Sequence, residues 1–259
     1  MYYKVEGRGE TVVFIHGLSD DLNYWEFLAA NLKDTYQILR FDLPGHGQSE
    51  LTDDVTRAYY IEDLKKQLDE LNIKKANFIG FSLGGAVAID FTVSYPDYVI
   101  SLVVMSGFSK CDDYLKDILN QFKTALNVSF DEFYNLVLPM VLCPEVIKSN
   151  KEELDLLRQT ASQTADTEAY IKAADVCLSF DIEEELSDIN VPTLILAGKY
   201  DEISRLSMER ELQGKIKNSR LIVFDNVKHN LLVGENNHKI LDILREFLKK
   251  KVVSNAILL

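Results

Sequence analysis

Cysteine and long apolar runs are both scarce in this sequence. The three cysteines among 259 residues, Cys111, Cys143 and Cys177, are an odd number without C-x-x-C spacing. They indicate neither a disulfide framework nor a zinc site, and they suit a reducing compartment. The first ten residues lack an apolar core of signal-peptide length, and no stretch reaches the roughly 18 apolar residues of a membrane span. We expect a cytoplasmic protein without a membrane span, whose apolar last eight residues form a frayed or packed tail.

Positive charge is also in deficit. The chain has 28 Lys and Arg residues against 41 Asp and Glu residues, which gives a formal net charge of −13. This balance repels phosphate backbones and anionic lipid, so nucleic acid is not an expected partner. The length suits one large α/β domain, or one domain with an insertion. We expect a monomer or homodimer that acts on a small-molecule substrate.

Strand-like and helix-like segments alternate over most of the chain. Compact apolar runs, most of them rich in β-branched residues, predict strands at 11–15, 37–43, 76–81, 98–105, 192–197 and 220–224. Apolar residues at helical spacing predict helices at 24–32, 59–71, 83–95, 204–216 and 236–250. This alternation predicts an α/β fold, a mostly parallel sheet flanked by helices, with ligands at the carboxyl ends of the strands.

The middle of the chain breaks this rhythm. Between residues 109 and 189 no convincing strand occurs, and helical runs recur at 114–126, 130–142, 152–161 and 167–178. We interpret 109–189 as a helical cap inserted into a core formed by 1–108 and 190–259. Such a cap excludes water and shapes the substrate pocket. Aromatic residues at helical spacing are more often cap core than pocket lining, and we expect this of Phe108, Phe122, Phe130, Phe133, Tyr134 and Phe180.

The predicted strand at 76–81 leads into the sequence G-F-S-L-G, in which Gly80 and Gly84 flank Ser82. In a strand-turn-helix setting, G-x-S-x-G is the pattern that exposes a nucleophilic serine. The sharp turn presses the chain against its neighbours, so the flanking positions must be almost free of side chain. The first N–H groups of the following helix lie beside the serine, where negative charge develops on a carbonyl oxygen under attack. Taken alone, the motif also fits an ordinary turn in a parallel sheet.

A nucleophilic serine requires a base, and the base requires an orienting acid. Of the four histidines, His229 follows the last predicted strand in a loop that can reach the strand ends. The other three lie in loops that precede the serine or in the polar start of the last helix. Asp201 follows the strand at 192–197 through a short loop, at the same edge of the sheet. Ser82, Asp201 and His229 are therefore the candidate nucleophile, acid and base.

Five motifs outside the predicted cap carry a family resemblance. They are H-G-L at 16–18, D-L-P-G-H-G-Q-S at 42–49, G-F-S-L-G-G at 80–85, L-I-L-A-G-K-Y-D at 194–201 and H-N at 229–230. Together they resemble the α/β-hydrolase superfamily, in the branch with a helical cap after the sixth strand. The order nucleophile, acid, base along the chain is also the order of that fold. The resemblance implies the α/β-hydrolase fold with an inserted helical cap.

The same resemblance implies roles for residues around the serine. The backbone N–H groups of Leu18 and Leu83 would form the oxyanion hole. His16 and Gly17 would support the first of these donors, while His46 would occupy a structural turn. The mechanism that these roles imply needs no metal ion and no organic cofactor.

We therefore expect a serine hydrolase that cleaves a small-molecule carboxylic ester or lactone through an acyl-enzyme intermediate. One alternative uses the same triad on a carbon–carbon bond, as the similar meta-cleavage-product hydrolases do. Arginines in the cap would favour that reading because its substrates are dianionic, and the predicted cap has only Arg158. The other alternative is a ligand-binding sensor with a retained triad, since a fold does not fix a function.

Overall fold

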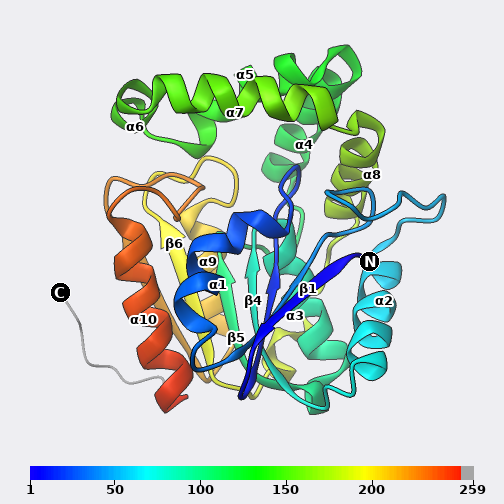
Figure 1. Cartoon of the computed structure of the whole chain (residues 1–259), viewed down its shortest axis with the longest axis vertical. Helices are drawn as coiled ribbons and strands as arrows, with labels where there is room; N and C mark the ends of the chain where they lie inside the picture. The colour runs from blue at the N-terminus through cyan, green and yellow to red at the C-terminus, as the bar shows by residue number, and fades with distance from the viewer. Residues whose placement is uncertain (252–259) are drawn as a thin grey trace.

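The computed structural model describes residues 1–251, and the expected apolar tail at 252–259 lies outside the described residues. At the centre is one seven-stranded sheet (Figure 1) in the order β1-β3-β2-β4-β5-β6-β7. Strand β1 pairs antiparallel with β3, and the other pairings are parallel. The predicted mostly parallel sheet is confirmed. The strands are β1 (Tyr3–Gly7), β2 (Thr11–Ile15), β3 (Gln37–Phe41), β4 (Ala76–Phe81), β5 (Val99–Met105), β6 (Thr193–Gly198) and β7 (Ser219–Phe224).

Helices cover both faces of this sheet, because the parallel strands are apolar on both sides. Successive residues of β2 alternate: Val13 belongs to one hydrophobic cluster and Phe14 to the other. The first cluster includes α2 (Arg57–Glu70), α3 (Leu83–Ser94) and α9 (Leu206–Lys215), and the second includes α1 (Glu26–Leu32) and α10 (Asn236–Lys250). No helix described within residues 1–251 is long and apolar enough to cross a bilayer.

Five α-helices lie between β5 and β6, and Figure 1 shows α5, α6 and α7 across the carboxyl ends of the strands. Four were predicted, and the six-residue α6 was not. They follow the fifth strand of this sheet in chain order, whereas the resemblance implied the sixth. The five are α4 (Asp113–Val128), α5 (Phe130–Val141), α6 (Pro144–Ser149), α7 (Lys151–Thr164) and α8 (Thr167–Leu178).

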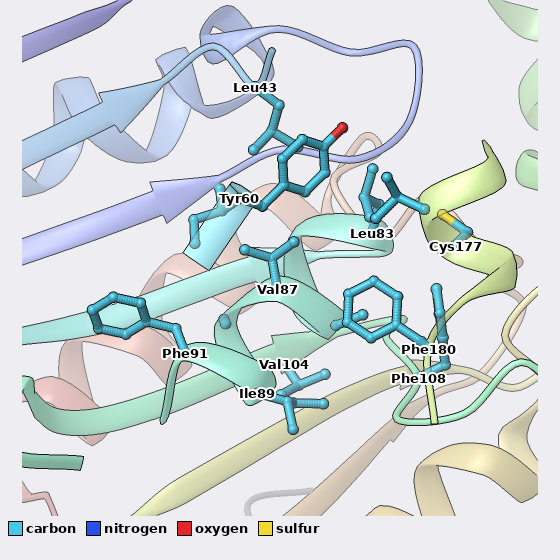
Figure 2. Close-up of a cluster of buried hydrophobic side chains, with 14 of the residues drawn as sticks. Leu43, Tyr60, Leu83, Val87, Ile89, Phe91, Val104, Phe108, Cys177 and Phe180 are labelled. Atoms are coloured by element: carbon cyan, nitrogen blue, oxygen red, sulfur yellow. The ribbon is translucent and has the colours of Figure 1, made fainter. Parts of the chain in front are cut away.

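Part of the first cluster joins these helices to the sheet. Figure 2 shows side chains from α3, β5 and α8 together, and the labelled ones are at most 2% exposed. Phe108, just after β5, packs edge-on against Phe180, just after α8, with ring centroids 5.7 Å apart. Cys177 of α8 belongs to the same cluster. The helix α8 is thus anchored to the core by buried apolar contacts.

Two local features differ from the sequence predictions. Strand β1 was missed because it has only five residues, some of them charged, and is half exposed, which is typical of an edge strand. Its Glu6 forms an ion pair with the buried Arg40 of β3, which fixes it at the edge of the sheet. The helix predicted at 24–32 begins as the 3₁₀ turn η1 (Leu22–Trp25) and continues as α1. Trp25, at the end of η1, is a core residue with no exposed surface.

The backbone is most tightly packed where β4 passes into α3. A Cβ atom on Gly80 would lie 2.1 Å from the carbonyl oxygen of Gly84, and one on Gly84 would lie 2.1 Å from that of Ile15. Because β2 and β4 are neighbours in the sheet, this turn lies beside the loop that begins at His16. From β2 the chain continues to β3 on one side, and from β4 it continues to β5 on the other side. Ligands of α/β sheets bind at such a point, where the strand order reverses.

We predict that Gly84→Ala destabilises the protein by about 3 kcal/mol, since its new methyl group meets backbone atoms that cannot move aside. Gly214→Ala in α9 is the matched control, because nothing lies within 4 Å of its added Cβ. That control should stabilise the protein by up to about 1 kcal/mol. Urea unfolding followed by circular dichroism measures both. Equal stability of Gly84→Ala and wild type would contradict the tight approach.

Candidate active site

Ser82 occupies the turn between β4 and α3, with φ 52° and ψ −118°. A positive φ is uncommon for any residue other than glycine, and strained backbone of this kind clusters at functional sites. Leu83 begins α3, so its N–H group is among the helix N–H groups without an intrahelical partner. The hydroxyl thus stands at a carboxyl strand end beside the positive end of a helix dipole.

His229 and Asp201 reach Ser82 from loops that follow β7 and β6. His229 Nε2 lies 2.9 Å from Ser82 Oγ, and His229 Nδ1 lies 2.8 Å from Asp201 Oδ2. The other oxygen of Asp201 accepts a hydrogen bond of 2.8 Å from the N–H of Ile203. His229 is 3% exposed and Asp201 is 6% exposed. The structure therefore brings the three candidate residues into one hydrogen-bonded row.

Ser106, at the end of β5, was not singled out from the sequence. Its Oγ donates a hydrogen bond of 2.8 Å to the carbonyl oxygen of His229, and its backbone has φ 48°. The side chain is fully buried. Ser106 thus holds the loop that carries His229 against the carboxyl end of β5. The only signal in the sequence is a serine directly after a predicted strand, which many turns share.

His16 links the loop after β2 to the loop after β3. Its Nε2 accepts from the N–H of Leu43 at 2.9 Å, so Nδ1 carries the proton and donates to the carbonyl oxygen of Gly17 at 2.7 Å. Burial, with the nearby His46, lowers the pKa of His16 to about 3. The imidazole is neutral at physiological pH and fixes the backbone just before Leu18.

His46 lies in a packed turn rather than beside Ser82. Its Nδ1 is 3.0 Å from the carbonyl oxygen of Pro44, and its ring lies 5.0 Å from that of Tyr170 in α8. Burial lowers the pKa of His46 to about 4, so this imidazole is also neutral at physiological pH.

Glu209 of α9 is a second buried carboxyl group that interacts with Asp201. It has no exposed surface, and neither of its carboxyl oxygens has a hydrogen-bond partner within residues 1–251. Burial and the charge of Asp201 raise the pKa of Glu209 well above its usual value. Burial therefore favours the protonated form of Glu209.

A cavity of about 270 Å³ opens above Ser82 and His229. Aliphatic and aromatic side chains from α4, α5 and α7 form most of its wall. Five of the six aromatic residues expected in the cap core line the cavity, and Phe180 does not. Four of the five also belong to the first hydrophobic cluster and the fifth packs against it, so these residues form both core and cavity wall. The lining residues are Leu18, Ser19, Asp20, Phe81, Ser82, Phe108, Leu115, Leu119, Phe122, Phe130, Phe133, Tyr134, Val137, Leu138, Val141, Leu157, Ala161, Cys177, Ile203, His229 and Asn230.

The end of α5 is hydrogen-bonded to the loop that carries His229. The N–H of Asn230 donates to the carbonyl oxygen of Val141 at 3.0 Å, and Lys228 Nζ donates to that of Pro139 at 2.6 Å. Lys228 also forms an ion pair with Glu202. The residues on either side of His229 thus connect it to the helices above the cavity.

Within residues 1–251, no group of three or more His, Cys, Asp or Glu side chains is arranged to hold a metal ion.

Comparison with known proteins gives relatives that share the α/β-hydrolase fold or a hydrolase activity. A family model described as alpha/beta hydrolase fold matches residues 10–235. The 3-oxoadipate enol-lactonase 1 of Acinetobacter baylyi is 29% identical over 240 residues, which cover 92% of this chain and 88% of the relative.

Two further proteins resemble the chain over nearly its whole length. The pimeloyl-acyl-carrier-protein methyl ester esterase of Vibrio cholerae is 25% identical over 241 residues, covering 88% of this chain and 91% of the relative. An alpha/beta hydrolase enzyme from a Medee basin deep-sea metagenome library has a solved structure with a TM-score of 0.91. It is 22% identical and covers 99% of this chain and 96% of that one.

These matches define the class of protein. The fold, together with a family model that spans most of the chain, shows that the chain belongs to the α/β-hydrolase fold family. Its curated relatives are hydrolases, which supports the same general class here.

We predict that the buried histidines make the fold sensitive to acid. A histidine in the unfolded chain has a pKa near 6.5, whereas the pKa of folded His46 is about 4. Between these two pH values the unfolded state therefore binds a proton at His46 that the folded state does not bind. Stability should therefore fall as the pH drops from 6.5 to about 4. His46→Gln should reduce that slope by about 1.4 kcal/mol per pH unit. Urea unfolding between pH 7 and 4.5 measures the slope.

The control for this prediction is His238→Gln, which removes an exposed histidine of α10. Its slope should match that of wild type, because the environment of an exposed side chain changes little on unfolding. A slope for His46→Gln that is identical to the wild-type slope would contradict the prediction.

Proposed function

We propose that this protein is a serine hydrolase that cleaves a small-molecule carboxylic ester or lactone through an acyl-enzyme intermediate. The observation that carries the proposal is the row from Ser82 Oγ to His229 Nε2 at 2.9 Å and from His229 Nδ1 to Asp201 Oδ2 at 2.8 Å, at the base of an apolar cavity. By their names, the two curated relatives act on an enol-lactone and a methyl ester, both of which contain an acyl–oxygen bond.

In the proposed first step, Ser82 Oγ attacks the substrate carbonyl carbon while His229 Nε2 takes the hydroxyl proton. Asp201 accepts a hydrogen bond from His229 Nδ1 and stabilises the imidazolium that forms. The tetrahedral oxyanion receives hydrogen bonds from the N–H groups of Leu18 and Leu83. Loss of one such donor would cost about 3 kcal/mol of transition-state stabilisation.

The tetrahedral intermediate then collapses. The acyl–oxygen bond breaks, His229 gives its proton to the departing alkoxide, and the acyl group remains on Ser82. Water, deprotonated by His229, attacks this acyl-enzyme and releases the acid. A lactone follows the same steps, except that the alcohol and acid remain in one product.

Observations around the cavity bear on the carbon–carbon alternative. Arg158, the one arginine of the predicted cap, forms an ion pair with Asp131 at 3.5 Å and does not line the cavity. None of the described residues that line the cavity is Lys or Arg. A dianionic substrate would therefore enter without a compensating charge, which is unfavourable in an apolar site. An uncharged ester or lactone needs no compensating charge in the cavity.

The proposal predicts hydrolysis of p-nitrophenyl esters in a series from acetate to decanoate. Ser82→Ala should lower kcat by at least about 1,000-fold, because the nucleophile of the acyl-enzyme path is gone. Ser179→Ala, at the end of α8, is a matched control whose hydroxyl bonds the carbonyl oxygen of Val176, and it should retain wild-type turnover. Equal turnover by Ser82→Ala and wild type would overturn the mechanism. Absence of turnover with every ester and lactone tested, despite labelling of Ser82 by a fluorophosphonate, would favour the sensor.

A further inference from the structure

The wall of the cavity contains one aspartate, Asp20, that the proposed reaction leaves without a role. It lines the same space as Ser82 and His229, and the described remainder of the wall includes no other Asp or Glu. Asp20 lies in the loop after β2, which also supplies His16 to Leu18. A carboxyl group is thus placed within the part of the site that would bind the reacting carbonyl.

The loop turns back on itself and holds this carboxyl group in place. The N–H of Asp20 donates to the carbonyl oxygen of Gly17 at 3.3 Å. A Cβ atom built on Gly17 would lie 3.0 Å from Asp20 Oδ2, so the side chain folds over the backbone just before Leu18. The absence of a side chain at Gly17 leaves room for the carboxyl group.

The charge of Asp20 acts on two nearby tyrosines. Burial and then the charge of Asp20 raise the pKa of Tyr170 in α8 to about 12, and the same two causes raise that of Tyr24 in η1. Burial, reinforced by Asp21 and opposed by His229, raises the pKa of Asp20 itself to about 7. Asp20 is therefore charged in mildly alkaline solution.

Nearby basic groups do not offset this charge within the cavity. Arg158 is paired with Asp131, and Lys228 is paired with Glu202 and with the carbonyl oxygen of Pro139. Neither basic side chain lines the cavity. A substrate carboxylate would thus face Asp20 in an apolar space without a cation to share, and like charges placed together in this way disfavour binding strongly.

We propose that Asp20 is a specificity-determining residue that excludes carboxylate-bearing substrates, so that the substrate class is esters or lactones without a negative charge. This inference rests on the proposed hydrolysis and narrows its substrate. It also gives a reason for a carboxyl group in a wall that is mostly aliphatic and aromatic, where burial of such a group is costly.

The first test compares two esters that differ only in charge. The p-nitrophenyl monoester of adipic acid carries a free carboxylate, and the p-nitrophenyl ester of adipamic acid carries an isosteric carboxamide. At pH 8.5, wild type should prefer the carboxamide by at least about tenfold in kcat/KM. Asp20→Asn should reduce that ratio at least fivefold. Asp54→Asn, the same change at an exposed aspartate outside the cavity wall, should leave the ratio within twofold of wild type.

The second test measures binding without turnover. In Ser82→Ala protein at pH 8.5, isothermal titration should show octanamide binding at least about tenfold tighter than octanoate, and adding Asp20→Asn should bring the two affinities within threefold. Asp20→Ser serves in both tests if the asparagine variant does not fold. Equal affinities in the Ser82→Ala protein, or a preference that survives loss of Asp20, would overturn the inference. Loss of ester turnover alone would overturn the proposed function and leave this binding contrast intact.

Discussion

The site depends first on a contact between backbones. At Gly84, α3 approaches the end of β2 so closely that the carbonyl oxygens of Ile15 and His16 occupy the space of a side chain. This approach sets the serine turn and the loop after β2 side by side, and within that turn Ser82 has a positive φ. The loops after β6 and β7 then need only reach the same edge of the sheet. The same close backbone approach shapes the fold and the site, since a looser turn would separate the Ser82 hydroxyl from the backbone N–H groups beside it.

Buried charge is kept to a minimum around this turn. His16 and His46 are neutral because burial lowers their pKa values, and burial raises the pKa of Glu209, which favours its protonated form. The chain as a whole carries a formal charge of −13, yet its cavity wall is mostly aliphatic and aromatic. In such surroundings each remaining charge acts over a longer distance than it would in water. The field inside the cavity is consequently determined by very few groups, of which Asp201 lies beneath it and Asp20 lies in its wall.

Much of this arrangement could be predicted from the sequence, for identifiable reasons. Buried parallel strands are apolar on both faces, so β2 and β4 were predicted to the residue, while the half-exposed edge strand β1 has no such pattern. Asp201 and His229 could be proposed because residues that follow parallel strands meet at one edge of the sheet. Ser106 and Asp20 could not, because their contacts depend on how loops turn back. The cap aromatics show the same limit: helical spacing places Phe122 and Phe133 on an inner face without showing that a cavity lies there.

The hydrogen bonds from Lys228 and Asn230 to the end of α5 have a mechanical consequence. They lie on both sides of His229, so any displacement of α5 that widens the cavity breaks two restraints on the loop that carries the imidazole. Each bond contributes only about 1 kcal/mol, which thermal motion can overcome. A movement of α5 that gives a ligand more access to the cavity would therefore leave the imidazole of His229 less firmly held. In the proposed mechanism, the hydrogen bonds from Asp201 through His229 to Ser82 would therefore be held most firmly while α5 keeps its two bonds to this loop.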